Sequence, residues 1–287
     1  MYNLYSKIAE NPAYYRQFNC REALITQINC HYQTKFDNFW SHNNYLVYII
    51  EGRRVWHTAE GSFELNKGNC VFVRKGACIV EHFTDSTFCV LVFFMPDDFI
   101  REVIRSRSRP IAASGSTFDR VMQVERNEAV QAFFQSMLLH FDAAQEPDAS
   151  LLELKFKEVI LTMADNPQNR ALNAFFASLL QEPQGVSMRR VMEDNFCYNL
   201  RLEEFARLSA RSLSAFKRDF QRLFQTSPGK WLLEKRLDHA MYLLSRLDKT
   251  VTEAAFDSGF ENISHFSRAF RQRYGCSPMS VKQQVLA

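Results

Sequence analysis

Apolar and polar residues follow one period in the first third of the chain and another in the remainder. From about residue 20 to 95, short β-branched and aromatic runs such as YLVYIIEG and FCVLVFF alternate with glycine or polar turn residues. Short strands at a spacing of roughly 8–12 residues are typical of a small barrel or a double-sheet roll. From Asp98 onward, apolar residues recur at helical spacing instead. The pattern therefore predicts an α+β protein with a β-barrel before a helical part.

Helices are predicted directly after the barrel. Pro96 ends the last strand, and a helix starts at Asp98, followed by helices over 128–141 and 151–163. The last of these is amphipathic, with apolar side chains on one face and charged ones on the other. Such a helix either covers the barrel or packs on its counterpart in a second subunit, so this region is also the predicted dimerisation segment.

Proline and glycine mark a break in the helical pattern. Pro167, Pro183 and Gly185 surround a short helical piece, which is the composition of a boundary between domains. We therefore divide the chain into a first domain (1–165), a linker (166–185) and a second domain (186–287).

The second domain contains two copies of one helical unit, over 202–231 and 251–278. In each copy an aromatic stripe is followed by Ser-Pro at the same distance. The stripes are Phe216, Phe220 and Phe224 in the first copy, and Phe266, Phe270 and Tyr274 in the second. The offset between copies is 50 residues here but 49 earlier in the unit, so the second copy has one extra residue in its turn, at Gly259-Phe260.

Each copy has the layout of a helix-turn-helix. A short helix carries a small residue, a tight turn follows, and Ser212 or Asn262 is placed to cap a second helix. The aromatic stripe of a helix is usually core, and basic residues opposite such a stripe are usually a solvated surface. Here, however, the polar face is repeated: Ser214 matches Ser264, and Arg218 matches Arg268. The repetition favours a face that contacts DNA, because such arginines can bond guanine O6 and N7.

The candidate DNA-contacting residues follow from these two faces. They are Ser214, Lys217, Arg218 and Arg222 in the first copy, and Ser264, Ser267, Arg268 and Arg271 in the second. A helix over 231–247 joins the copies and would fix their separation. Two recognition helices joined by one rigid helix can enter successive major grooves about 34 Å apart.

Charge divides the chain in the same way. Residues 184–287 have 17 Lys and Arg against 11 Asp and Glu, a net charge of +6, while the remainder has a net charge of −3. A basic end indicates a polyanionic partner. The first residues do not have the pattern of a signal peptide, so we expect none, and the longest apolar run, Phe88–Met95, is too short to span a membrane. Seven scattered cysteines without metal spacing fit reduced thiols of a cytoplasmic protein, with redox sensing as a weaker alternative.

These residues resemble the AraC/XylS family of bacterial transcription regulators. The resemblance covers about 186–284 and is carried by the two helix-turn-helices, by Arg236-Leu237 and Ala240 of the connecting helix, and by AAFDSGFENISHFSRAFRQRYGCSP. It implies that Ser214, Lys217, Arg218, Ile263, Ser264, Ser267 and Arg268 contact bases. Ile263 departs from the family pattern, where a polar residue is more usual. The implied function is sequence-specific promoter binding, with activation as the commoner mode and RNA polymerase as a partner.

The N-terminal part resembles the cupin-like regulatory domains of the same family. YLVYIIEG and GSFELNKGNCVFVRKG are most similar to the subgroup that activates type III secretion genes. In that subgroup the domain forms a homodimer and responds to a protein partner. For this chain the resemblance implies a dimer controlled by a small-molecule effector or a regulatory protein, and the sequence leaves that choice open.

Two other functions compete with this interpretation. A cupin-like barrel could be a metal enzyme, but His31, His42, His57 and His82 form no His-x-His pair with a glutamate. We therefore expect no metal, no cofactor and no enzymatic activity. Alternatively, the chain binds DNA, and its N-terminal half only dimerises and receives no signal.

Overall fold

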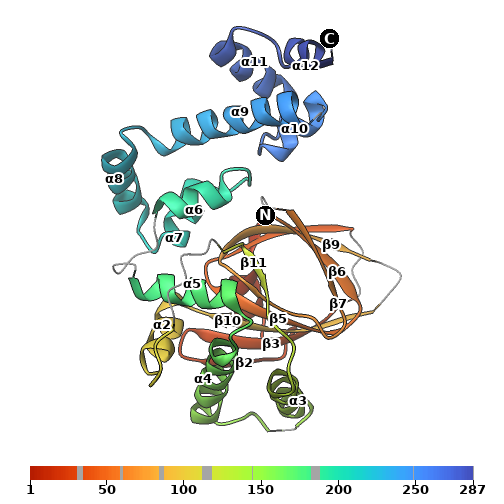
Figure 1. The fold of residues 1–287 in the computed structure, drawn as a ribbon, viewed down its shortest axis with the longest axis vertical. Helices are drawn as coiled ribbons and strands as arrows, with labels where there is room; N and C mark the ends of the chain where they lie inside the picture. The colour runs from red at the N-terminus through yellow and green to blue at the C-terminus, as the bar shows by residue number, and fades with distance from the viewer. Residues whose placement is uncertain are drawn as a thin grey trace. The chain divides into compact units, whose positions relative to one another are not determined.

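A computed structural model of the chain describes residues 1–30, 35–58, 61–83, 87–111, 118–143, 145–181, 188–247 and 249–286. They form two compact units, Met1–Gln184 and Gly185–Ala287 (Figure 1). The first unit combines two β-sheets with helices, whereas the second is built of helices. The predicted α+β class is confirmed.

One sheet of the first unit has five strands in the order β1-β4-β9-β6-β7. Their bounds are Tyr2–Asn3 (β1), Phe36–Ser41 (β4), Gly76–His82 (β9), Arg53–Thr58 (β6) and Gly61–Asn66 (β7). The short helix α1 (Leu4–Ala9) follows β1, and the Asn3 side chain caps it by accepting a hydrogen bond from the Ser6 backbone N–H at 2.8 Å. β1 pairs parallel to β4, while the other pairs are antiparallel.

The other sheet has six antiparallel strands in the order β11-β8-β5-β10-β3-β2. Their bounds are Val121–Gln123 (β11), Cys70–Val73 (β8), Asn44–Glu51 (β5), Phe88–Met95 (β10), Ala23–Cys30 (β3) and Gln17–Cys20 (β2). Central strand β10 pairs with β5 on one side and β3 on the other. The two sheets together form the predicted barrel-like double-sheet roll.

The six-stranded sheet is buried on both faces, which explains its unbroken apolar strands. In β10, Val90, Val92 and Phe94 belong to the core cluster between the two sheets. The alternate residues Leu91 and Phe93 belong instead to a second cluster, shared with helices. Because side chains alternate along a strand, a strand covered on both faces needs apolar residues at nearly every position.

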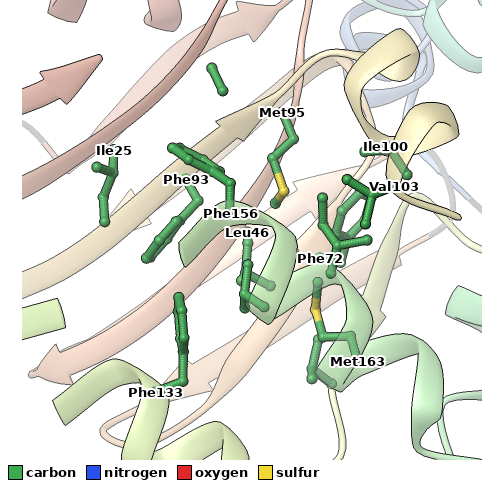
Figure 2. Packing of buried hydrophobic residues seen from close by; sticks show 14 of the residues in the cluster. Ile25, Leu46, Phe72, Phe93, Met95, Ile100, Val103, Phe133, Phe156 and Met163 are labelled. Carbon is green, nitrogen blue, oxygen red and sulfur yellow. The ribbon is translucent and has the colours of Figure 1, made fainter. Parts of the chain in front are cut away.

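Four helices supply the second of these clusters and gather on the same side of the barrel (Figure 1). Their bounds are Asp97–Arg105 (α2), Glu128–Asp142 (α3), Ala149–Asp165 (α4) and Arg170–Gln181 (α5). Figure 2 shows the side chain of Phe93 near those of Phe133 and Phe156. Its ring centroid lies 5.6 Å from that of Phe133 and 5.7 Å from that of Phe156. The predicted helices at Asp98, 128–141 and 151–163 are therefore confirmed, and the last of them covers the sheet.

The predicted linker, 166–185, differs from the structure. Most of it is helix α5, which packs as part of the first unit because Phe175 and Phe176 bury their rings against Phe72 of β8. The sequence suggested a boundary because Pro167 and Pro183 flank this helix, but its apolar face needs the sheet. Residues 182–187 lie outside the described residues.

The second unit consists of seven helices among the described residues. Their bounds are Met188–Asn195 (α6), Leu202–Leu208 (α7), Leu213–Phe224 (α8), Pro228–Arg246 (α9), Val251–Asp257 (α10), Ile263–Tyr274 (α11) and Pro278–Leu286 (α12). The single connecting helix, predicted over 231–247, is α9. No described helix has the length and apolar character needed to cross a membrane.

Candidate nucleic-acid interface

The second helix of the first copy is α8. Ser212 Oγ accepts a hydrogen bond from the Ala215 backbone N–H at 3.3 Å, which caps this helix as predicted. Phe216 and Phe220 are buried on its inner side. The side chains predicted to contact DNA all lie on its exposed surface: Ser214, Lys217, Arg218 and Arg222.

The second helix of the second copy, α11, repeats this construction. Asn262 Oδ1 accepts a hydrogen bond from the His265 backbone N–H at 3.0 Å, and Phe266 and Phe270 are buried. Ser267 is half-buried. The other predicted side chains are exposed: Ile263, Ser264, Arg268 and Arg271.

Matching glutamates fix the first helix of each copy. The Glu204 carboxylate accepts a hydrogen bond from the Arg201 backbone N–H at 2.6 Å, and the Glu253 carboxylate accepts one from the Thr250 backbone N–H at 2.8 Å. Both are the returning half of a capping box. The backbone hydrogen bond from Thr250 lowers the pKa of Glu253. The two helices α7 and α10 therefore begin in the same way.

The turns differ where the sequence places an extra residue. Ala210 has a φ of 53° and Gly259 a φ of 86°, so both turns pass through the left-handed region. The connection from α10 to α11 is one residue longer than that from α7 to α8, which confirms the predicted insertion. Ala206 and Ala255 are buried, as expected where another helix approaches closely.

A half-buried arginine joins the connecting helix to the loop between α6 and α7, directly before the first copy. Arg236 on α9 donates from Nε to the carbonyl of Phe196 at 2.7 Å and from Nη2 to the carbonyl of Tyr198 at 2.8 Å. Burial lowers the pKa of Arg236. On the same loop, the Cys197 carbonyl oxygen would lie 2.6 Å from a Cβ added at Gly259 of the second copy. We call these five residues the junction, because they hold the loop before the first copy and the turn of the second copy against α9.

Asp219 brings three arginines together on the first copy. Its carboxylate lies 2.7 Å from Arg222, 3.3 Å from Arg218 and 3.4 Å from Arg211. The hydrogen bond from Arg222 is the largest of several effects that lower the pKa of Asp219. Two of the predicted DNA-contacting arginines are therefore held by one carboxylate.

The second copy has no such carboxylate on its recognition helix. Its equivalent position is Ala269, which is buried. Arg268 makes no ion pair with any residue that the structure describes. Arg273, later in the helix, instead pairs with Asp238 of α9 at 2.7 Å.

A groove of about 780 Å³ runs between the two copies. Its lining includes Leu202 from the first copy, Leu232 of α9, and Ser264 and Arg268 of the second recognition helix. Two of the predicted base-contacting residues of α11, Ser264 and Arg268, thus line a depression rather than a flat surface.

Sequence reasoning missed Asp219 and the bonding partners of Arg236. Asp219 stands three residues before Arg222, a spacing at which helical side chains meet, so that pair was available from the sequence. The partners of Arg236 are backbone carbonyls 40 and 38 residues away, and no local pattern marks them.

The first unit encloses a small cavity between its sheets, lined among others by Tyr45, Trp56 and His82. Its volume is about 50 Å³, far below the 300–1,000 Å³ of typical small-molecule sites. Burial lowers the pKa of His82 to about 4, so this imidazole is neutral near pH 7.

The histidines considered as metal ligands have separate environments. His42 hydrogen-bonds Asn3 at 3.1 Å, and His57 contacts Ser62 at 2.8 Å and Glu81 at 3.2 Å. His31 lies outside the described residues. Over the described ranges, histidine, cysteine and acidic side chains form no cluster of three or more suited to a metal ion. Burial raises the pKa of the Cys78 thiol to about 12, which makes it a poor redox sensor.

Both units match known protein families. Residues 44–175 match the ExsA N-terminal regulatory domain, and residues 203–284 match a helix-turn-helix domain. The second match spans both copies of the repeated unit, from α7 to α12.

Individual relatives extend over most of the chain. The virulence regulon transcriptional activator VirF of Yersinia enterocolitica is 24% identical over 245 residues, which are 84% of this chain and 90% of VirF. The transcriptional regulator ExsA of Pseudomonas aeruginosa is 24% identical over 266 residues, 89% of this chain and 92% of ExsA. Among solved structures, apo ToxT from Vibrio cholerae, as a point variant, matches with a TM-score of 0.42 at 11% identity, covering 92% of this chain and 97% of that chain.

Proposed function

Because the chain belongs to the AraC/XylS family of DNA-binding transcriptional regulators, we propose that it binds promoter DNA through α8 and α11 in two successive major grooves. The observation that carries this proposal is the repeated exposed face. Two helices with the same buried pair of phenylalanines present serine and arginine at matching outer positions.

We assign each predicted DNA-contacting side chain a role that suits its chemistry. Arg218 and Arg268 bond guanine edges, which accept two hydrogen bonds from one guanidinium. Ser214 and Ser264 lie in the first turn of their helices, where hydroxyls can reach bases or phosphates. The remaining positions are assigned to supporting contacts with bases or backbone: Lys217, Arg222, Ser267 and Arg271. Ile263 packs on a thymine methyl group, since it has no polar atom in its side chain.

The junction favours a domain whose two copies contact DNA as one rigid body rather than as two flexibly tethered modules. Arg236 and Gly259 tie the α6–α7 loop, α9 and the second turn to one another. A fixed distance between recognition helices demands a fixed spacing between half-sites, about one turn of DNA.

Selection of bound duplexes from fragmented genomic DNA tests this proposal and reveals the half-site spacing. On a selected duplex, Arg218→Ala and Arg268→Ala should each relax base preference and cost about 1–3 kcal/mol of binding free energy. Arg246→Ala is a matched control, because Arg246 is exposed at the end of α9 and outside both recognition helices. Unchanged affinity and footprint in the double variant would show that these arginines do not read bases.

We assign regulation to the first unit. The small size of the described cavity favours a protein partner that binds the surface over a small molecule held between the sheets. Exposed leucines on neighbouring helices α3 and α4 offer a surface for a second copy: Leu139, Leu151 and Leu154. A full-length Leu154→Glu variant that sediments as a smaller species than the parent would support a homodimer through this face.

Activation through RNA polymerase, in the cytoplasm, completes the proposal. VirF is named as a transcriptional activator, and its similarity extends over both units of this chain. Transcription from a selected promoter in vitro, with and without the protein, measures the sign of regulation. The alternative, in which the first unit only dimerises and receives no signal, predicts the same transcription whatever partner is added.

A further inference from the structure

The first recognition helix carries one negative charge within its basic face. Asp219 Oδ1 accepts a hydrogen bond from Arg218 Nε at 3.3 Å and another from Arg222 Nη2 at 2.7 Å. The arginine side chains remain about three-quarters exposed, at 72% and 74%, while that of Asp219 is 25% exposed. The carboxylate therefore lies beneath the two guanidinium groups, which stay open to solvent.

The atoms used in these bonds decide what remains for DNA. Asp219 takes the Nε–H of Arg218, and no contact of the described residues takes its two terminal nitrogens. Those terminal nitrogens are a pair that can reach O6 and N7 of one guanine. The bond at Nε also restricts rotation of the long side chain, so less freedom is lost when the guanidinium binds a base.

A phosphate and a guanine edge meet this arrangement differently. A phosphate near Arg218 or Arg222 is repelled by the Asp219 carboxylate, because both are anionic. A guanine edge has no net charge and meets no such repulsion. Non-specific binding depends almost entirely on phosphate attraction, so a carboxylate here penalises non-specific DNA more than the correct base.

We propose that Asp219 is a specificity-determining residue: it orients Arg218 for a guanine edge and weakens the hold of the first recognition helix on phosphates. This inference rests on the proposed DNA-binding function and names a residue that discriminates within it. The second copy has no carboxylate at the equivalent position, which is Ala269.

Asp219 also touches the turn, through Arg211 at 3.4 Å. A purely structural role would therefore be to hold the turn against α8. That role predicts a less stable protein that loses affinity for all duplexes by the same factor. The two roles differ in the ratio of specific to non-specific affinity, which a structural role would not change.

The test compares full-length parent and Asp219→Asn on two duplexes, one selected from a randomised pool and one with its sequence shuffled. We expect the Asp219→Asn variant to bind the shuffled duplex about five- to tenfold more tightly, with the slope of log affinity against log salt steeper by about 0.9. Affinity for the selected duplex should rise less, so the specificity ratio falls. Asp219→Glu keeps the charge and should restore most of the ratio.

Asp257→Asn is the matched control, since it removes the same charge from an exposed pair with Lys249 in the same unit. An equal gain in non-specific binding by this control would overturn the inference, because net charge alone would then explain the effect. An unchanged ratio in Asp219→Asn, or equal loss on both duplexes with a lower melting temperature, would also overturn it. If the parent selects no sequence at all, the proposed function itself fails.

Discussion

The two helix-turn-helix copies have nearly the same scaffold but different surfaces. Inside, each copy has a buried alanine, a glutamate that caps the first helix and a buried pair of phenylalanines. Outside, the first copy pairs two arginines with Asp219, whereas Arg268 of the second makes no ion pair with a described residue. The two copies therefore share the residues that stabilise the fold and differ in the residues on the proposed DNA-contacting surface. We therefore expect the first copy to contribute more to base choice and the second more to general affinity.

The largest expected effect is a loss of stability that would distinguish the two turns. Gly259→Ala should lower the free energy of unfolding by about 2 kcal/mol or more, because a left-handed alanine costs about 1–2 kcal/mol and its Cβ would lie 2.6 Å from the Cys197 carbonyl oxygen. Calorimetry of the full chain measures the loss. Ala210→Gly is the control, and it should change stability by less than about 1 kcal/mol. Similar melting of the two variants would contradict a special role for the second turn.

Arg236→Leu tests whether the copies act as one body. It leaves the carbonyls of Phe196 and Tyr198 without their donor, at a cost of about 1–3 kcal/mol. Affinity for a duplex with both half-sites should fall more than affinity for a single half-site. The neighbouring Lys235→Ala loses a solvent-accessible ion pair with Glu193 at 3.9 Å and a contact with the Trp231 ring at 5.6 Å, and it should leave both affinities nearly unchanged. Equal losses on both duplexes would mean that the junction stabilises the fold without setting the spacing.

Substitutions of the two recognition arginines should have effects of similar size but of different kinds. Arg218→Ala should cost about 1–3 kcal/mol on the selected duplex and relax preference at one base pair. Arg268→Ala should cost a similar amount but weaken the shuffled duplex as well, with a shallower salt dependence, because Arg268 forms no ion pair with a described acidic residue. Titrations at several salt concentrations measure both. Identical salt slopes for the two variants would remove the proposed division between the copies.

Ile263→Ala should have the smallest effect. Ile263 is 37% exposed, while Leu213 at the equivalent position is half-buried. Loss of a methyl contact should cost about 1 kcal/mol and should be confined to duplexes with thymine at one position. Replacing that thymine by uracil removes the same methyl group and should abolish the difference between parent and variant. A persistent difference would place Ile263 elsewhere than against that methyl.

Features set by neighbouring residues could be predicted from the sequence. The caps Ser212 and Asn262, the aromatic stripes and the longer second turn depend on contacts within a few positions, and all are present. The outward direction of the predicted arginines also follows from helical periodicity. Their contacts with DNA remain predictions.

Features set by distant residues could not be predicted. Helix α5 looked like a linker because its prolines are local, while the sheet that covers Phe176 comes from about a hundred residues earlier. The pairing of Asp219 with Arg211 depends on how the turn folds back on α8. The hydrogen bonds of Arg236 depend on packing between copies.

The packing of α5 also determines where the chain can be cut for study. A fragment that ends at residue 165 would leave Phe72 without the rings of Phe175 and Phe176, whose centroids lie 5.5 Å and 5.7 Å away. An apolar strand uncovered in this way is prone to aggregate, so such a fragment should be poorly soluble when expressed. A fragment that continues through Gln181 keeps the sheet covered, so it is the shortest fragment suitable for studying the first unit alone.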